Sequence, residues 1–478
     1  MSSPLFKHLI HKYFWFLAII FFAGCLSNHY ERTENFAFWW KIGDFEQAAM
    51  EVEKLAEKGP KKDRMLYSME EGAVKRLQND VEGSIRAFSI AGNDYEKWFG
   101  IHLNSQTKIT EELRSTIGAS ESKPYKSRVY ERVMIRLYQA LNYLQTGKSG
   151  PARAEIFKIR QAINDSKQIW RMELESAKSL MKERSVNLDK GLNNQATNQL
   201  EKDLRRIREM IPSNLPNFVN PAAIYLESLY FLYHATERSD FDKARFSLQQ
   251  LLAIDPKNPY LKDDFVQASE NKISDVPVTY IFFETGRAPV RREKRYDFPL
   301  SLLSPTSRVP YLGLAFPTLV LNENFLSHLE VSFDSNQTIR TLPLANMDAI
   351  VANEFDKEFP IELSKAIAGS LTRGAVQYIA TNALREESPI VQATGGVGIG
   401  MVAQGLTQSD CRSWTTLPKQ IQFCKIPCGR STELTLRGVE TKLEKTVILK
   451  PATVNLVWVR SISAHTPLRI VNQFALRH

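Results

Sequence analysis

The sequence has little cysteine and histidine, and it lacks the common catalytic motifs. Only 4 of its 478 residues are cysteine and 8 are histidine. Three of the cysteines, Cys411, Cys424 and Cys428, lie close together without a nearby histidine, whereas a zinc site normally needs four such ligands in short paired spacings. No Gly-x-Ser-x-Gly or His-Glu-x-x-His motif of the hydrolases occurs. We therefore predict no metal, no cofactor and no enzymatic activity.

The chain also lacks the apolar content of a polytopic membrane protein and the charge excess of a nucleic-acid-binding protein. Its mean hydropathy is -0.29, while each membrane-spanning helix needs about 20 mostly apolar residues. The net charge of +9 arises from 62 basic and 53 acidic residues, a small excess for this length. With 43% hydrophobic residues the chain can fold, and its length predicts two to four domains. We expect no nucleic-acid partner.

The N-terminus has the parts of a lipoprotein signal peptide. Lys7 and Lys12 precede an apolar run over residues 13–22, and Ala23-Gly24 stand directly before Cys25. We predict a signal peptide over residues 1–24, a palmitate-bearing Cys25 and a tether over residues 25–34. Leu26 after the cysteine favours the outer membrane, on its periplasmic face, by analogy with lipoprotein sorting. The alternative is a short signal anchor, or an ordinary secretory peptide with an incidental cysteine.

Residues 35–274 show helical periodicity with repeated turns. Gly43-Asp44 and Asn79-Asp80 each separate two apolar-periodic segments, and their spacing of about 36 residues is close to the ~34-residue tetratricopeptide (TPR) period. The last unit ends at Pro259. We predict a TPR-like α-solenoid with a concave partner-binding surface; an irregular helical bundle is the alternative. Within it, residues 155–211 predict two long helices paired as a hairpin, with a partner-binding coiled coil as the alternative.

Residues 275–478 read as a β-rich domain. A helical insertion over about 346–406 interrupts it, so the fold class is α + β multidomain. Glu354 and Glu358 lie near the start of the insertion and are expected to serve its helix dipole. The uncharged, glycine-rich run over residues 390–406 predicts a helix buried against the sheet, with membrane contact as the alternative. The predicted strands cover residues 278–284, 329–333, 420–423, 433–436, 445–449 and 455–459.

Two loops of this β-rich half carry the candidate binding residues. A loop that brings acidic, basic and aromatic side chains together could hold a sugar or an acidic ligand. These candidates are Glu284, Arg287, Asp410, Arg412 and Trp414. In an oxidising periplasm we also predict a disulfide from Cys411 to either Cys424 or Cys428, since the latter two would be too far apart on one extended strand.

Several segments together resemble a family of uncharacterised TPR-like lipoproteins of Gram-negative bacteria. The family has no established activity, and it is similar to proteins encoded near lipoproteins that activate penicillin-binding proteins. Here Cys411 departs from the family motif, which carries a small polar residue at that position. The resemblance lies in Pro124-Tyr125 to Val133, Ala140 to Leu144, Asn217 to Pro221, Phe283 to Val290, Leu314 to Pro317, Met347 to Phe355 and Asp410 to Pro418.

These observations predict a lipid-anchored scaffold. We expect it to bind other envelope proteins through the concave TPR-like surface, in cell-envelope or peptidoglycan assembly. One alternative is a carbohydrate- or ligand-binding module, or an enzyme, that uses the C-terminal loops. Another is a subunit of a larger envelope complex.

Overall fold

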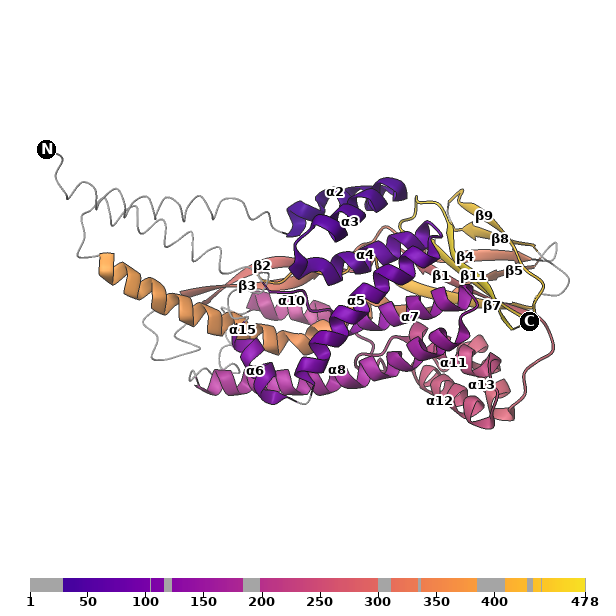
Figure 1. Cartoon of the computed structure of the whole chain (residues 1–478), viewed down its shortest axis with the longest axis horizontal. Coiled ribbons are helices and arrows are strands. Elements are labelled where there is room, and N and C mark those ends of the chain that lie inside the picture. Colours follow the sequence, from indigo (N-terminus) through magenta and orange to yellow (C-terminus); the bar gives the residue numbers. More distant parts are fainter. Residues whose placement is uncertain are drawn as a thin grey trace.

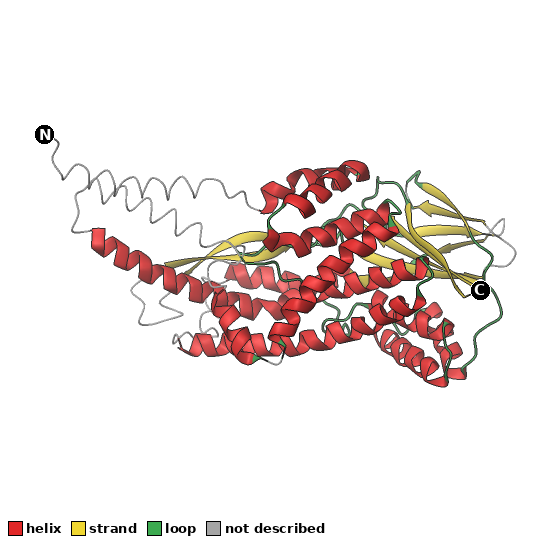
Figure 2. Ribbon diagram, viewed as in Figure 1, coloured by secondary structure: helices red, strands yellow, loops and turns green. Residues whose placement is uncertain are grey.

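The computed structural model confirms the α + β class (Figures 1 and 2). It describes residues 29–103, 105–115, 123–183, 198–299, 311–333, 337–384, 409–427, 433–439 and 441–477. The predicted signal peptide, Cys25 and the run 390–406 lie outside these residues. Among the helices that are described, none is long and apolar enough to cross a membrane.

The first half consists of helices that pack side by side in successive pairs, α2 with α3, α4 with α5, α7 with α8 and α11 with α12. Helix α2 begins inside the segment predicted as a tether. The helices are α2 (His29–Ile42), α3 (Phe45–Lys58), a 3-10 turn (Lys61–Asp63), α4 (Arg64–Leu77), α5 (Val81–His102), α6 (Gln106–Ser115), α7 (Val129–Gln145), α8 (Ser149–Glu183), α10 (Asn198–Glu209), α11 (Pro221–Tyr233), α12 (Arg238–Ile254), α13 (Pro259–Glu270) and, in the second half, α15 (Met347–Leu384).

The repeated turns of the sequence are helix boundaries in the structure. Gly43 and Asn79 both adopt a left-handed backbone conformation, with φ of 83° and 59°, which ends the preceding helix. The next residues, Asp44 and Asp80, are N-caps whose side chains accept the backbone N–H groups of Gln47 and Gly83 respectively. The same local chemistry therefore generates the turns of the first two helix pairs.

The strands form three sheets. The central five-stranded sheet has the order β11-β10-β1-β7-β6, in which β1 and β10 are parallel and the other pairs are antiparallel; a β2–β3 ribbon and a β5-β4-β8-β9 sheet complete the set. The strands are β1 (Val278–Thr285), β2 (Val290–Pro299), β3 (Tyr311–Val320), β4 (Leu329–Phe333), β5 (Gln337–Arg340), β6 (Leu342–Asn346), β7 (Gln420–Pro427), β8 (Glu433–Gly438), β9 (Glu444–Ile448), β10 (Val454–Ser461) and β11 (Arg469–Arg477).

Helices α4, α7 and α11 pack against the central sheet (Figure 1). Every residue of α11 is buried, and its Tyr225 ring lies 4.7 Å from the Phe423 ring on β7. Arg76 of α4 donates to Asn472 of β11 at 2.8 Å. The helices and the sheet therefore share one apolar core. The apolar sides of α4, α7 and α11 that meet the sheet are covered by the chain's own strands, because apolar side chains need burial.

The helical insertion begins where the sequence predicts. The side chain of Asn346 accepts the backbone N–H of Asp348 at 3.0 Å and so caps α15. Since the flanking strands β6 and β7 are paired neighbours, the insertion leaves and rejoins the sheet at one edge. Helix α15 packs with α8, α10 and β3 around a second core, and it runs with the β2–β3 ribbon away from the central sheet in Figure 1.

Candidate functional site

The segment 410–416, which we call the strap, passes buried between the helices and the sheet. Helix α4 holds it with Asp63 at its start and Glu70 two turns later, a spacing that places both carboxylates on one side of the helix. Asp63 accepts from the Arg412 guanidinium at 2.6 Å. Glu70 accepts the backbone N–H groups of Thr415 at 2.6 Å and Thr416 at 3.1 Å. The motif that the sequence offers as a ligand loop is thus anchored by ion pairs and hydrogen bonds.

A third carboxylate binds the strap to α7. Glu131 accepts the backbone N–H of Trp414 at 3.0 Å, the Tyr125 hydroxyl at 2.7 Å and the N–H of Arg128 at 2.8 Å. The indole of Trp414 is buried in the helical core, with its ring 5.7 Å from that of Phe88. The strap therefore joins α4, α7 and the core in one rigid unit.

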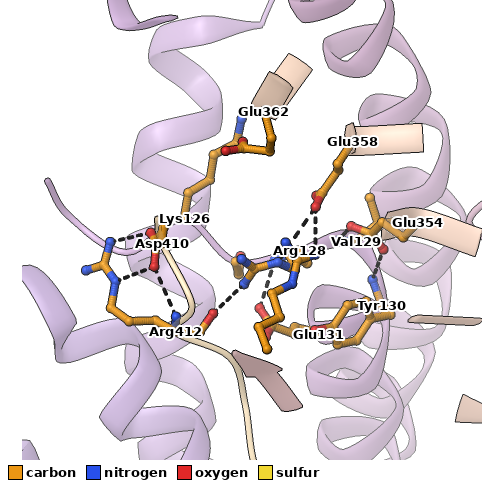
Figure 3. A network of polar contacts seen from close by, with 12 residues as sticks. Lys126, Arg128, Val129, Tyr130, Glu131, Glu354, Glu358, Glu362, Asp410 and Arg412 are labelled. Atoms are coloured by element: carbon orange, nitrogen blue, oxygen red, sulfur yellow. Dashed lines mark hydrogen bonds and ion pairs between the residues drawn. The ribbon is translucent and has the colours of Figure 1, made fainter. Parts of the chain in front are cut away.

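A large cavity of about 840 Å³ opens on one side of the strap. Figure 3 shows the polar contacts among several of its lining residues, including Arg128, Glu358 and Asp410. Asp410 lines it, together with residues of α4, α5, α6, α8, β2 and α15. Its floor contains two buried arginines that share one carboxylate. Glu358 accepts from Arg291 at 2.7 Å, and the same oxygen lies 3.8 Å from Nε of Arg128. Burial would raise the pKa of Glu358, but Arg291 and Arg128 outweigh it and hold the pKa below its usual value.

Glu354, one turn before Glu358 on α15, caps α7 instead of its own helix. It accepts the N–H groups of Val129 at 2.6 Å and Tyr130 at 3.0 Å. Burial, and then the Glu358 carboxylate, raise the pKa of Glu354. The expectation that these acids serve the dipole of α15 is therefore wrong; they connect the insertion to α7 and to the cavity floor.

Lysines and an indole line the outer part of the cavity. Lys126 lies over the Trp98 ring at 4.4 Å, and His102 stacks on the same ring at 4.5 Å. Lys61 and Lys108 are exposed and make no ion pair with any residue the structure describes. Among the acids beside them, Asp94 pairs with Arg64, whereas the exposed Glu111 makes no ion pair with a described residue. Two lysines against one glutamate leave an excess of unpaired positive charge at the mouth.

A smaller cavity of about 430 Å³ lies on the other side of the strap. Cys411, Ser413 and Thr415 line it, while Asp410 lines the large cavity. The strap therefore contributes to the lining of both cavities and lies between them. Helix α2 and the edge of the β2–β3 ribbon supply most of the remaining lining.

The five residues of two loops that were predicted to form one ligand site lie in separate places. Arg412 pairs with both Asp410 and Asp63, the latter at the start of α4. Glu284, on β1, lies beside Arg76 at the other end of this 14-residue helix, about 20 Å from Asp63. There it accepts a hydrogen bond from the Trp458 indole at 2.6 Å. The other two are divided as well, since Trp414 is in the core and Arg287 lines the smaller cavity. The prediction of one shared site is wrong because ion pairs and burial occupy most of these side chains.

Cys411 and Cys424 are both free and buried. Cys424 lies on β7 opposite Ile281, inside the core that the five-stranded and four-stranded sheets share, whereas Cys411 lines the smaller cavity. Burial raises the pKa of Cys411 to about 11 and that of Cys424 to about 12. A disulfide between these two is therefore wrong, and Cys428, the other predicted partner, lies outside the described residues.

Sequence reasoning missed the residues that build the cavity floor. Arg128 and Glu131 fall inside a segment noted for its family resemblance, but nothing local shows that they meet α15 and the strap. In the ranges described, no group of three or more His, Cys, Asp or Glu is placed to hold a metal ion. Comparisons with protein families, curated proteins and solved structures found no match to this chain.

Proposed function

We propose that this chain is a lipoprotein of the outer membrane, facing the periplasm, that binds an acidic segment of a partner protein in its large cavity. The unpaired positive charge at the cavity mouth is the observation that carries the proposal. Lys61 and Lys108 have no carboxylate partner among the described residues, and a partner carboxylate would supply one.

The lining also favours a peptide over a small ion. Trp98 and the exposed Ile101 offer apolar surface beside the lysines, and aromatic anchors next to charged groups are typical of binding surfaces. The volume of about 840 Å³ accommodates several side chains. Because Glu358 already pairs with both arginines of the floor, we expect binding without a chemical step.

The helix pairs support the same role. Their order and repeated caps are consistent with a TPR-like arrangement, and we propose that it serves as a scaffold whose inner face carries the chain's own sheet. The binding surface then lies at the junction of the two halves, not on an open concave face. On the family resemblance of the sequence we propose that the process is cell-envelope or peptidoglycan assembly.

The lipid anchor is tested by labelling cells with radioactive palmitate. We expect label on the parent protein and none on the Cys25→Ser variant, because the acyl chains attach at this cysteine. Label that persists in the variant, or a parent protein that takes up none, would overturn the anchor and leave the cavity as a separate question.

The docking site is tested by photocrosslinking in living cells. A photoreactive phenylalanine analogue replaces Ile101 at the cavity or Ile448 on β9; both side chains are exposed. We expect a discrete crosslinked partner from position 101 and none from position 448. Identical adducts at both positions, or no adduct at position 101, would contradict the proposal.

A further inference from the structure

The smaller cavity contains an arginine that has no anionic partner among the described residues. The strand β1 ends at Thr285. Gly286 follows with a φ of 66°, and the next residue, Arg287, lines the cavity. Within the described residues Arg287 makes no ion pair, and its Nε is buried without a hydrogen-bond partner. Its charged neighbour is Arg460, another cation. A half-buried guanidinium in such surroundings is costly unless an anion binds it.

The rest of the cavity combines positive charge with apolar walls. Lys41 and the exposed Arg292 also line it, and the lining contains one acidic residue, Glu34. Arg292 lies 4.4 Å above the Tyr30 ring and forms no ion pair with a described residue. The walls are made of Phe36, Phe38, Trp40, Val290 and Val320. A ligand that matches this lining has an anionic group and an apolar part.

The cavity lies close to the proposed lipid attachment. His29 and Tyr30, at the start of α2, line it. The chain from Cys25 to His29 can reach at most about 14 Å, so an anchored molecule holds this cavity next to the membrane surface. Phe38, 53% exposed, adds an apolar contact at the same end of the molecule.

We propose that the smaller cavity binds the phosphate-bearing headgroup of a membrane lipid, with Arg287 and Arg292 on the phosphate and the aromatic walls around the first part of the acyl chains. The inference deepens the proposed function: it rests on the lipid anchor for its location and is independent of partner docking. It gives α2 a second role, which is to orient the anchored molecule on the membrane.

Calorimetry on the mature lipidated chain in a neutral detergent tests the proposal. Dihexanoyl phosphatidylglycerol is titrated into the parent protein and into R287Q/R292Q. We expect binding to the parent and an affinity that is at least about tenfold lower in the double variant, since a hydrogen bond to a charged group changes the affinity by about tenfold or more. The matched variant R245Q/R437Q removes two exposed arginines on α12 and β8 and should bind as the parent does.

Two further measurements separate the explanations. Inorganic phosphate alone should bind at least about tenfold more weakly than the lipid, because it cannot use the apolar walls; equal affinity would overturn the lipid assignment. The single variant R287Q should keep or raise the melting temperature, since it removes an unpaired charge. A lower melting temperature of R287Q would show that Arg287 has a structural role. Phosphatidylglycerol binding that is unchanged in R287Q/R292Q would overturn the proposed lipid site.

Discussion

Arg412 is the residue that holds the strap in place. It is 1% exposed, and its guanidinium donates to Asp410 at 2.6 Å and to Asp63 at 2.6 Å. Nothing in the sequence links Asp63 to Arg412, because they are far apart along the chain and meet only in the folded molecule. The sequence motif offers Arg412 as a binding residue, but its ion pairs in the folded molecule give it a structural role.

We predict that Arg412→Met lowers the free energy of unfolding by about 3 kcal/mol, since it removes the partner of Asp410 and one of the two arginines, Arg32 being the other, that pair with the buried Asp63. Urea unfolding of the mature chain provides the measurement. The control Arg437→Met breaks an ion pair that is 56% exposed on the arginine side and should cost less than about 1 kcal/mol. Equal effects of the two variants would show that the strap is not held by this pair.

His29 makes the start of α2 sensitive to acid. Burial lowers the pKa of its imidazole to about 4, with Asp63 and Asp410 opposing and Arg412 and Arg32 adding to the shift. The unfolded value is 6.5, so the folded state disfavours the proton. The stability that the neutral ring provides is fully present above pH 6.5 and is lost as the pH falls from 6.5 to 4.

The loss should reach about 2 kcal/mol at pH 5. The free energy of unfolding, measured at pH 7 and pH 5, should fall by this amount more in the parent than in His29→Gln. His465→Gln changes an exposed histidine and should show the same fall as the parent. A parent and a His29→Gln variant with the same pH dependence would contradict the assignment.

At the scale of elements, the sequence predicted those helix ends and strands that depend on neighbouring residues alone. The turn residues Gly43-Asp44 and Asn79-Asp80 end and cap helices as expected, and the alternating apolar segments became β1, β4, β7, β8, β9 and β10. Strand β2 was missed because it is rich in charge. Its Arg291 and Lys294 pair with Glu358 and Asp203 from distant helices, and such partners cannot be identified from a single sequence.

Close helix approach at small residues can be tested with two glycines. A Cβ at Gly72 on α4 would lie 2.6 Å from the Phe88 ring of α5, whereas a Cβ at Gly100 on α5 would meet nothing within 4 Å. Gly72→Ala should therefore destabilise the chain by about 1 to 3 kcal/mol. Gly100→Ala should stabilise it by about 0.5 to 1 kcal/mol through helix propensity. Chemical denaturation of both variants measures the difference, and a stabilising Gly72→Ala would refute the close packing.

At the scale of the whole molecule, the two halves depend on each other. The change from helices to strands between α13 and β1 could be predicted, but the shared core could not, since it depends on which face of each helix meets the sheet.

A chain that ends at residue 274 would expose α11, of which all 13 residues are buried in the intact protein. We predict that this chain aggregates and binds a hydrophobic dye in size-exclusion and fluorescence experiments. A soluble monomer with a cooperative unfolding transition would contradict this.

The proposed docking of an acidic partner segment is tested most directly by photocrosslinking at position 101 in the presence and absence of the cavity lysines. The variant K61E/K108E reverses two unpaired charges at the mouth and leaves the buried floor intact. We predict that the crosslinked partner seen with the parent disappears from this variant, while palmitate labelling of Cys25 is unchanged. A partner band of equal strength in K61E/K108E would contradict the account.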